Sequence, residues 1–253
     1  MSTLHHRCRL LLLSLILIGW WSPAPIFAQE TAREAEQEET KLPPPLTEYF
    51  GRKIAQTMHY TGAPWLTRES REREEDCQTL LRELRVKPGQ RVCDLGCGNG
   101  FYTLQLAERV GEKGKVLAVD IQPEMLELLK KRAEEEDLTE RIQPILGTVA
   151  DPKLPDDSVD LVLFIDVYHE LAYPEQILAK IRSALKPGGL LVLAEFRLED
   201  PEVPIKLLHK MSKEQIDKEM RANGFRLARS FDDLPWQHLV FYEVDEDREP
   251  AKR

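Results

Sequence analysis

Cysteine is scarce in this chain, with four residues among 253. Cys8 precedes the apolar N-terminal stretch, so Cys77, Cys93 and Cys97 are left for the rest of the protein. An odd number without a framework spacing gives no disulfide signature. Two cysteines close in sequence, without further Cys or His nearby, are also too few for a metal site. We therefore interpret Cys93 and Cys97 as small buried or loop residues, and expect no metal.

The sequence also lacks an excess of positive charge and a long hydrophobic run. Its net charge is −9 and its pI is near 5.3, which argues against a surface built for nucleic-acid phosphates. The apolar stretch over residues 10–21 is short for a membrane-spanning helix, which needs about 20 residues. We expect no nucleic-acid partner, and membrane contact only through the N-terminus.

That N-terminus has the order of an export signal. Arg7 and Arg9 precede the apolar stretch, Pro23 and Pro25 follow it, and Ala28 offers a small residue for cleavage. We predict a signal peptide over residues 1–28, cleavage near Ala28, and a periplasmic or secreted protein. An uncleaved N-terminal membrane anchor is the alternative.

Composition divides the rest of the chain. Residues 29–45 are acidic and then proline-rich, which is typical of a disordered linker. Residues 46–85 carry aromatic side chains among basic ones, and we predict an N-terminal helical lid or arm there, with one helix over 70–84. Residues 86–245 form the main domain, and residues 246–253 are a charged tail.

Apolar stretches alternate with amphipathic ones across the main domain. They predict strands at 91–96, 115–120, 141–148, 159–166, 190–196, 225–231 and 238–244, and helices at 101–110, 123–136, 173–185 and 212–224. Strands that are apolar throughout and alternate with helices indicate a parallel sheet covered on both faces. Ligands of such sheets bind at the carboxyl ends of the strands.

Three alternating glycines, Gly96, Gly98 and Gly100, follow the first of these strands. Such a loop lets the backbone approach a ligand closely, and the next helix points its free N–H groups at that ligand. The spacing is not that of a dinucleotide loop, because Phe101 stands where the third glycine would be. Asp94 suits a ligand with an ammonium or sulfonium group better than a pyrophosphate.

Four segments, in this order, resemble the motifs of class I S-adenosylmethionine-dependent methyltransferases. They are VCDLGCGNG at 92–100, AVDIQPEML at 118–126, LPDDSVDLVLFIDVYHEL at 154–171 and LKPGGLLVLAEF at 185–196. The resemblance covers roughly residues 75–244. It implies an α/β, Rossmann-like, doubly wound and mostly parallel seven-stranded sheet with helices on both faces and a last antiparallel strand. It also implies the cofactor S-adenosyl-L-methionine.

The resemblance further implies roles for single residues around the donor. Asp94, Gly96 and Gly98 would hold the methionine moiety, and Gly100 would give the loop its turn. Asp120 would accept the ribose hydroxyls.

At the adenine, the resemblance places Ile121 against the ring. The acid that usually follows a glycine after the third strand is missing, because Thr148 follows Gly147. The nearest acid, Asp151, is the candidate for the adenine contact.

Two further residues are candidates for catalysis. Asp166, at the end of the fourth strand, would face the methionine end or the reacting centre. Transfer from a sulfonium needs a base only where the acceptor must lose a proton. His169 is the best candidate for that base, because imidazole titrates near neutrality, and a packing or helix-capping histidine is the alternative. His209 is a second candidate.

The favoured function is methyl transfer to a small-molecule acceptor. A protein or nucleic-acid acceptor is one alternative, and a donor-binding domain without catalysis is another. In residues 46–85 we predict a lid with Trp65 and Arg68 near the site, or else an arm that only packs against the sheet. The sequence leaves the acceptor and the oligomeric state open.

Overall fold

The computed structural model of the chain describes residues 42–247. The predicted signal peptide, residues 29–41 of the predicted linker and residues 248–253 of the predicted tail lie outside this range. Within it, no helix combines the length and the apolar composition that crossing a membrane requires.

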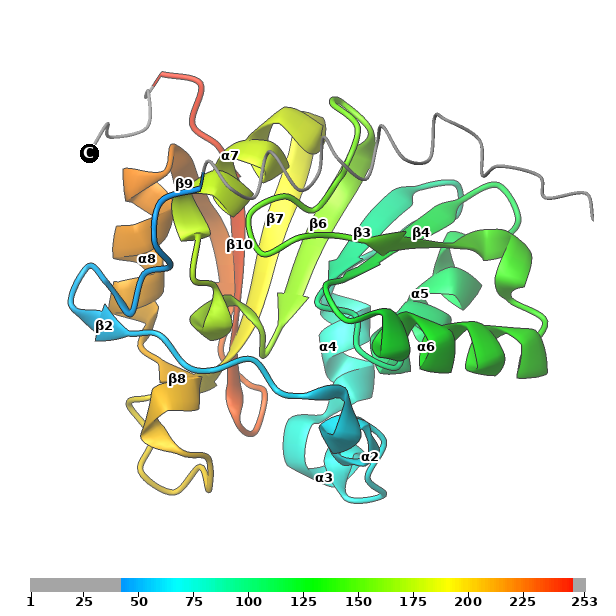
Figure 1. The fold of residues 1–253 in the computed structure, drawn as a ribbon, viewed down its shortest axis with the longest axis horizontal. Coiled ribbons are helices and arrows are strands. Elements are labelled where there is room, and N and C mark those ends of the chain that lie inside the picture. Colours follow the sequence, from blue (N-terminus) through cyan, green and yellow to red (C-terminus); the bar gives the residue numbers. More distant parts are fainter. Residues whose placement is uncertain (1–41, 248–253) are drawn as a thin grey trace, which may run out of the picture. The chain divides into compact units, whose positions relative to one another are not determined.

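A central sheet and its flanking helices make up most of the described chain (Figure 1). The strands are β1 Glu48–Tyr49, β2 Arg52–Lys53, β3 Arg91–Leu95, β4 Lys115–Asp120, β5 Ile142–Leu146, β6 Val159–Ile165, β7 Leu185–Arg197, β8 Lys210–Met211, β9 Phe225–Phe231 and β10 Gln237–Val244. The α-helices are α2 Ala63–Leu66, α3 Arg71–Glu75, α4 Cys77–Glu83, α5 Phe101–Val110, α6 Pro123–Glu135, α7 Pro174–Ala184 and α8 Lys213–Ala222. The 3-10 turns are η1 Tyr60–Gly62, η2 Thr139–Arg141, η3 Tyr168–Glu170 and η4 Leu207–His209.

The sheet has the strand order β5-β4-β3-β6-β7-β10-β9, and the two-residue β8 pairs with the end of β7. Pairs along β5-β4-β3-β6-β7 are parallel, and β10 is antiparallel to both of its neighbours. The order of parallel strands reverses direction between β3 and β6, where open α/β sheets bind ligands. The predicted Rossmann-like sheet with a late antiparallel strand is confirmed.

Alternate residues of the strands pack on opposite faces. Val92 packs in a core with α4, α5 and α6, whereas its neighbour Cys93 packs in a second core with α7 and α8. This two-residue period follows from strand geometry, and burial on both faces explains why the central strands are apolar throughout. Cys77, Cys93 and Cys97 are all buried and free, as their spacing suggested.

Two predicted elements are different in the structure. The predicted helix over 70–84 is broken into α3 and α4 at Asp76, which has a left-handed backbone with φ of 50°. Its carboxylate accepts the N–H of Thr79 and so starts the second helix. The strand predicted at 190–196 begins earlier, because residues 186–189 also lie within β7, where the pairing with β6 shifts and Gly188 has φ of 78°.

Residues 46–84 form an arm that runs along the carboxyl ends of the strands (Figure 1). Its first part is held by backbone hydrogen bonds from Leu46 N to Ala172 O and from Ala55 N to His169 O. Its last helix, α4, packs in the same core as α5 and α6. The arm is therefore fixed at its start by η3 and the loop after it, and at its end by the core under α5 and α6, and it passes the ligand-binding edge in between.

Candidate active site

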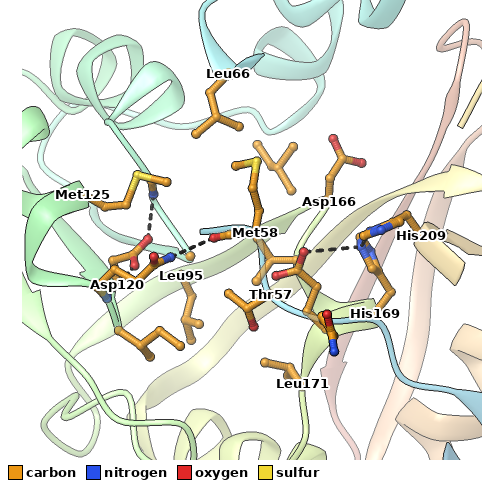
Figure 2. A pocket seen from close by; sticks show the side chains of 18 of the residues that line it. Thr57, Met58, Leu66, Leu95, Asp120, Met125, Asp166, His169, Leu171 and His209 are labelled. Atoms are coloured by element: carbon orange, nitrogen blue, oxygen red, sulfur yellow. Dashed lines mark hydrogen bonds and ion pairs between the residues drawn. The ribbon is translucent and has the colours of Figure 1, made fainter. Parts of the chain in front are cut away.

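Residues from distant parts of the chain line one cavity at the carboxyl ends of the strands. It has a volume of about 740 Å³, within the usual range for small-molecule sites. The glycine loop, the ends of β4 and β6, η3 and the arm all contribute to its wall. Figure 2 shows Asp120, Asp166 and His169 around it, together with Met58 from the arm. We call this cavity the central pocket.

The glycine loop connects β3 to α5 at the wall of the central pocket. Gly96, Gly98 and Gly100 have φ of 77°, 53° and 83°, a region that only glycine adopts without steric cost. A Cβ atom at Gly96 would lie 2.6 Å from a methyl of Val167, and one at Gly98 would lie 2.6 Å from a methyl of Leu66. Gly96 and Gly98 line the pocket, whereas Gly100 is the N-cap residue of α5.

Asp94 lies beneath this loop and does not line the central pocket. It is 4% exposed, and its carboxylate accepts a hydrogen bond from the Thr103 hydroxyl at 2.6 Å. Burial raises the pKa of Asp94 to about 6. Its contact with the methionine moiety stays a prediction, because the structure places its carboxylate behind the loop.

Asp120 ends β4 with its carboxylate at the pocket wall. One oxygen accepts the N–H of Gly98 and the other accepts the N–H of Gln122, both at 2.9 Å. Burial raises the pKa of Asp120. Each oxygen keeps a second lone pair, so the fixed carboxylate can accept further hydrogen bonds from hydroxyl groups. Ile121 follows it and also lines the pocket, 39% exposed.

Asp151 does not line the central pocket. It accepts the N–H of Lys153, and the ammonium groups of Lys153 and Lys180 lie 3.3 and 3.4 Å from its carboxylate. Thr148 and Val149, from the same loop, line the pocket instead. The predicted adenine contact of Asp151 therefore receives no support from its position.

Asp166 lines the pocket directly after β6, and it has φ of 55°. Its Oδ2 accepts a hydrogen bond from the Gln237 amide at 2.9 Å, while its Oδ1 is buried and has no donor among the residues that the structure describes. Burial, with the nearby carboxylates of Glu75 and Glu195, raises the pKa of Asp166 well above its ordinary value. A strained backbone and an unpartnered buried oxygen are typical of a ligand-binding position.

Glu75 connects this part of the pocket to the arm. It is 1% exposed, and its carboxylate accepts hydrogen bonds from Arg68 at 2.6 Å, Arg71 at 2.9 Å and the Gln237 amide at 3.3 Å. The Arg68 guanidinium also lies 3.8 Å from the centre of the Trp65 ring. Trp65 lines the pocket, whereas Arg68 does not and supports Trp65 from behind.

His169 is 1% exposed and is held from one side by Glu195 of β7. Its Nδ1 lies 2.6 Å from one oxygen of Glu195, and the other oxygen accepts the N–H of Tyr168 at 2.7 Å. Because a carboxylate only accepts, Nδ1 carries a proton, and in the neutral imidazole Nε2 is then the nitrogen with the lone pair. The contact thus fixes both the ring orientation and the tautomer of His169.

Two more titratable groups, His209 and Glu170, face that lone pair. Nε2 of His169 lies 3.0 Å from Nδ1 of His209, in η4, and 3.9 Å from the Glu170 carboxylate (Figure 2). Burial lowers the pKa of His209 and raises the pKa of Glu170 to about 7. Three ionisable side chains of the pocket wall therefore meet around one point.

Gln122, at the N-terminus of α6, fastens the arm over the pocket. Its amide donates to Met58 O at 2.9 Å and accepts the N–H of Tyr60 at 2.8 Å. Asn99 of the glycine loop adds a hydrogen bond to Ala63 O at 3.1 Å. These contacts keep the middle of the arm in the pocket wall, and its action as a lid stays a prediction.

Three residues of the site were not singled out from the sequence: Glu75, Glu195 and Gln237. Glu195 carried a usable signal, because it is the single acid in the apolar stretch 190–196. A carboxylate buried in a central strand requires a partner. The sequence does not show that this partner is His169. The pairing of β6 with β7 brings η3, and with it His169, beside Glu195.

Comparison with known proteins agrees with this geometry. The sequence model of a family described as "Methyltransferase domain" matches residues 86–245. Among solved structures, a SAM-dependent methyltransferase from Aquifex aeolicus superimposes with a TM-score of 0.70 at 26% identity, covering 74% of this chain and 100% of that one.

Curated relatives match over shorter stretches. The demethylmenaquinone methyltransferase of Lysinibacillus sphaericus is 31% identical over 115 residues, which are 46% of this chain and 48% of the relative. The carboxy-S-adenosyl-L-methionine synthase of Shigella boydii is 32% identical over 149 residues, 58% of each chain. This chain thus spans about half the length of these curated relatives.

Proposed function

The chain belongs to the methyltransferase domain family and is an S-adenosylmethionine-dependent methyltransferase, and we propose that its acceptor is a small, mostly apolar molecule with an ionisable hydroxyl group. The observation that carries this proposal is that His169, in the wall of the central pocket, contacts the buried Glu195 at 2.6 Å. A buried imidazole held by a carboxylate is a proton-accepting site. Such a site serves an acceptor that must lose a proton.

The residues present fit the donor. The backbone at Gly96 and Gly98 comes to the pocket wall without side chains, and the fixed carboxylate of Asp120 can accept two hydroxyls of a ribose. The unpartnered Oδ1 of Asp166 suits the ammonium of a methionine moiety. When bound, S-adenosylmethionine supplies a methyl group that is already activated on a sulfonium. What the chain must add is positioning, exclusion of water and removal of the acceptor's proton.

The imidazole pair of His169 and His209 performs the proton removal in this proposal. Methyl transfer to the acceptor's oxygen, or to a carbon conjugated with it, would break the carbon–sulfur bond of the donor and release S-adenosylhomocysteine. The hydroxyl proton goes to the lone pair of His169 Nε2, where Glu195 stabilises the resulting imidazolium. His209, half-buried and 3.0 Å away, then passes a proton to solvent.

The lining of the pocket supports an apolar acceptor. Beyond the carboxylates, most of its wall consists of aliphatic side chains and the rings of Trp65 and Phe196. The aliphatic residues include Leu95, Ile165, Val167, Leu171 and Ile205. Several relatives in the comparison are named for demethylmenaquinone, whose reduced form is a hydroxylated ring. A phenol or an enol of similar size matches both the lining and the proton acceptor.

The test is product formation by the full chain. The protein is incubated with methyl-labelled S-adenosylmethionine and a panel of phenols, enols, amines and thiols, and methylated products are measured by mass spectrometry. We expect methylated phenols or enols. His169→Gln and Glu195→Gln should each lower the rate by about 10²- to 10⁴-fold, the usual contribution of general base catalysis.

His238→Gln is the matched control, because His238 contacts Glu199 at 2.7 Å in a second histidine–glutamate pair that does not line the pocket. This variant should keep the parent rate. Turnover of amines or thiols alone, or an unchanged rate of His169→Gln across pH, would refute the proposed acceptor class and base.

We further propose that the protein is exported, on the basis of Arg7, Arg9, the apolar stretch 10–21 and Ala28. The check is the mass of the protein recovered from its native host. A chain that begins at Gln29 is expected, and an intact N-terminus on a protein found in the cytoplasm would contradict export.

A further inference from the structure

The residues that face His169 Nε2 have the composition of a metal site. They are one nitrogen each from His169 and His209 and a carboxylate oxygen from Glu170, and these ligand atoms all lie within 4.8 Å of one another. We propose that this cluster binds a divalent transition-metal ion of the Zn²⁺ type at the wall of the central pocket. Binding itself does not depend on the proposed function, and only its effect on turnover rests on that function.

The separations of the ligand atoms suit such an ion. Metal–ligand bonds to imidazole nitrogen and carboxylate oxygen are about 2.0–2.2 Å long, so two ligands of one ion lie roughly 3–4 Å apart. Nε2 of His169 is 3.0 Å from Nδ1 of His209 and 3.9 Å from Oε1 of Glu170. A shared ion requires the Glu170 carboxylate to move closer to the two imidazole nitrogens.

A second observation, independent of the cluster, is the support of His169 from behind. Glu195 accepts a hydrogen bond from Nδ1–H of His169 at 2.6 Å, so in the neutral ring Nε2 is the nitrogen with a lone pair. Histidine ligands of metals are oriented in this way by a carboxylate on the other ring nitrogen. The main-chain carbonyl of His169 is also fixed, by Arg52 at 2.9 Å and by Ala55 N at 3.2 Å.

The pocket offers room for further ligands. His169, Glu170 and His209 all line it, so a bound ion keeps at least one coordination position open to the cavity. Two imidazoles and one carboxylate favour Zn²⁺, Co²⁺, Ni²⁺ or Fe²⁺ over Mg²⁺ and Ca²⁺, which prefer oxygen ligands. A simple N–H···N hydrogen bond accounts for the contact of the two histidines, and the Glu170 carboxylate has a hydrogen bond from the main chain of Met58, so the titration below must decide between this arrangement and a bound ion.

The ion and the acceptor's proton compete for the same lone pair. A cation on Nε2 of His169 prevents that nitrogen from accepting a proton, so the metal-bound protein should be the less active form. The enzyme stripped of metal should therefore be the most active, and added Zn²⁺ should inhibit in a way that a chelator reverses.

Binding is tested by calorimetric titration of ZnCl₂ into the full chain after chelation. His5, His6 and Cys8 are ordinary Zn²⁺ ligands elsewhere in the sequence, so they are replaced by alanine or serine in the parent used for this titration. We expect one ion per chain with a dissociation constant in the micromolar range or below, and no binding of Mg²⁺. With Co²⁺ as the probe, visible absorption should report nitrogen ligation.

His209→Gln is the decisive variant, because a half-buried side chain on a short turn can be changed without loss of the fold. It should abolish the cobalt spectrum and weaken Zn²⁺ at least 100-fold. Glu195→Gln should weaken Zn²⁺ by about 10- to 100-fold, the usual effect of a supporting carboxylate, and His238→Gln should change nothing. An absence of Zn²⁺ binding, or binding that survives in His209→Gln, would overturn the site.

The activity assay separates this inference from the proposed function. Competition at Nε2 of His169 predicts that Zn²⁺ inhibits the parent. It also predicts that Zn²⁺ does not inhibit the residual turnover of His209→Gln. Stimulation by Zn²⁺ would overturn that competition and with it the role of His169 as base. Failure to find any acceptor leaves the calorimetric result intact, because the titration needs neither donor nor acceptor.

Discussion

At the scale of single residues, the carboxylate of Asp120 is the group in the central pocket that we assign to the ribose of the donor. Replacing it by alanine removes an acceptor for the ribose hydroxyls. Hydrogen bonds to a charged group contribute about 1.5–3 kcal/mol, so Asp120→Ala should weaken S-adenosylmethionine by about 10- to 100-fold in calorimetry.

Asp151→Ala is the control for this measurement. Its carboxylate pairs with Lys153 and Lys180 outside the pocket, and we expect parent-like affinity. If Asp151→Ala weakens the donor while Asp120→Ala does not, the ribose and adenine ends have been assigned to the wrong loops.

Asp94 gives a second prediction at this scale, on stability in the absence of donor. Its pKa is raised from 3.8 to about 6 by burial, so between these values the folded protein holds a proton that the unfolded chain has released. The free energy of unfolding therefore falls as pH rises from about 4 to 6, by about 3 kcal/mol from this residue. Asp94→Asn cannot ionise, and its amide oxygen can still accept the Thr103 hydroxyl.

The measurement is urea unfolding of Asp94→Asn and the parent at pH 4 and pH 8. A carboxylate with a raised pKa that does not act on Asp94, such as Asp166, affects both proteins alike and cancels in the difference. We take the free energy of unfolding of the variant minus that of the parent at each pH. This difference should be more positive at pH 8 than at pH 4. An equal difference at the two pH values would show that Asp94 does not carry a buried charge.

The sequence predicted individual site residues where a motif fixes their position on a strand end. Gly96, Gly98, Asp120, Asp166 and His169 belong to such segments, and the structure places all five in one pocket wall. Their roles stay predictions. Glu195, Glu75 and Gln237 could not be assigned in this way, because their partners are brought to them only by strand pairing and by the arm.

At the scale of elements, Gln122 joins the N-terminus of α6 to the arm through Met58 and Tyr60. Gln122→Ala removes both hydrogen bonds, each contributing about 0.5–1.5 kcal/mol. Amide hydrogen exchange over residues 57–62 should therefore become roughly 10-fold faster, while exchange in β3 and β4 stays unchanged.

Gln105→Ala is the matched control on α5, where the amide of Gln105 accepts a hydrogen bond from Gln78 on α4. It should leave exchange over residues 57–62 unaltered. Equal protection of residues 57–62 in Gln122→Ala and the parent would mean that the arm is held by its two ends alone.

The alternation of strands and helices, and their assembly into a covered parallel sheet, followed from the sequence because strands apolar on both sides have few alternatives to such a sheet. The arm was harder to predict. Its helix over 70–84 is interrupted by a single left-handed residue, Asp76, and nothing in the apolar pattern marks that break. Its position across the pocket depends on side-chain contacts such as those of Gln122 with Met58 and Tyr60. The sequence does not reveal them, because a glutamine is equally common at the solvent-exposed end of a helix.

At the scale of the whole molecule, the central pocket draws its wall from the arm, β3, β4, β6, β7, η3 and η4. A ligand in it therefore touches the sheet and the arm at once. Its binding free energy should stabilise the folded unit to which the described residues from Pro45 onward belong. Donor at 100 times its dissociation constant contributes about 2.7 kcal/mol. For a unit of this size each kcal/mol shifts Tm by about 2–4 °C.

We thus expect S-adenosylmethionine and S-adenosylhomocysteine each to raise Tm by roughly 5–10 °C at that concentration, measured by calorimetry at pH 7. Asp120→Ala should show a smaller shift at the same donor concentration, since less of it is bound. If the transition splits and the donor moves only one part, the arm and the sheet unfold separately. The pocket would then be completed only when the arm docks, and donor affinity would include the free energy of that docking.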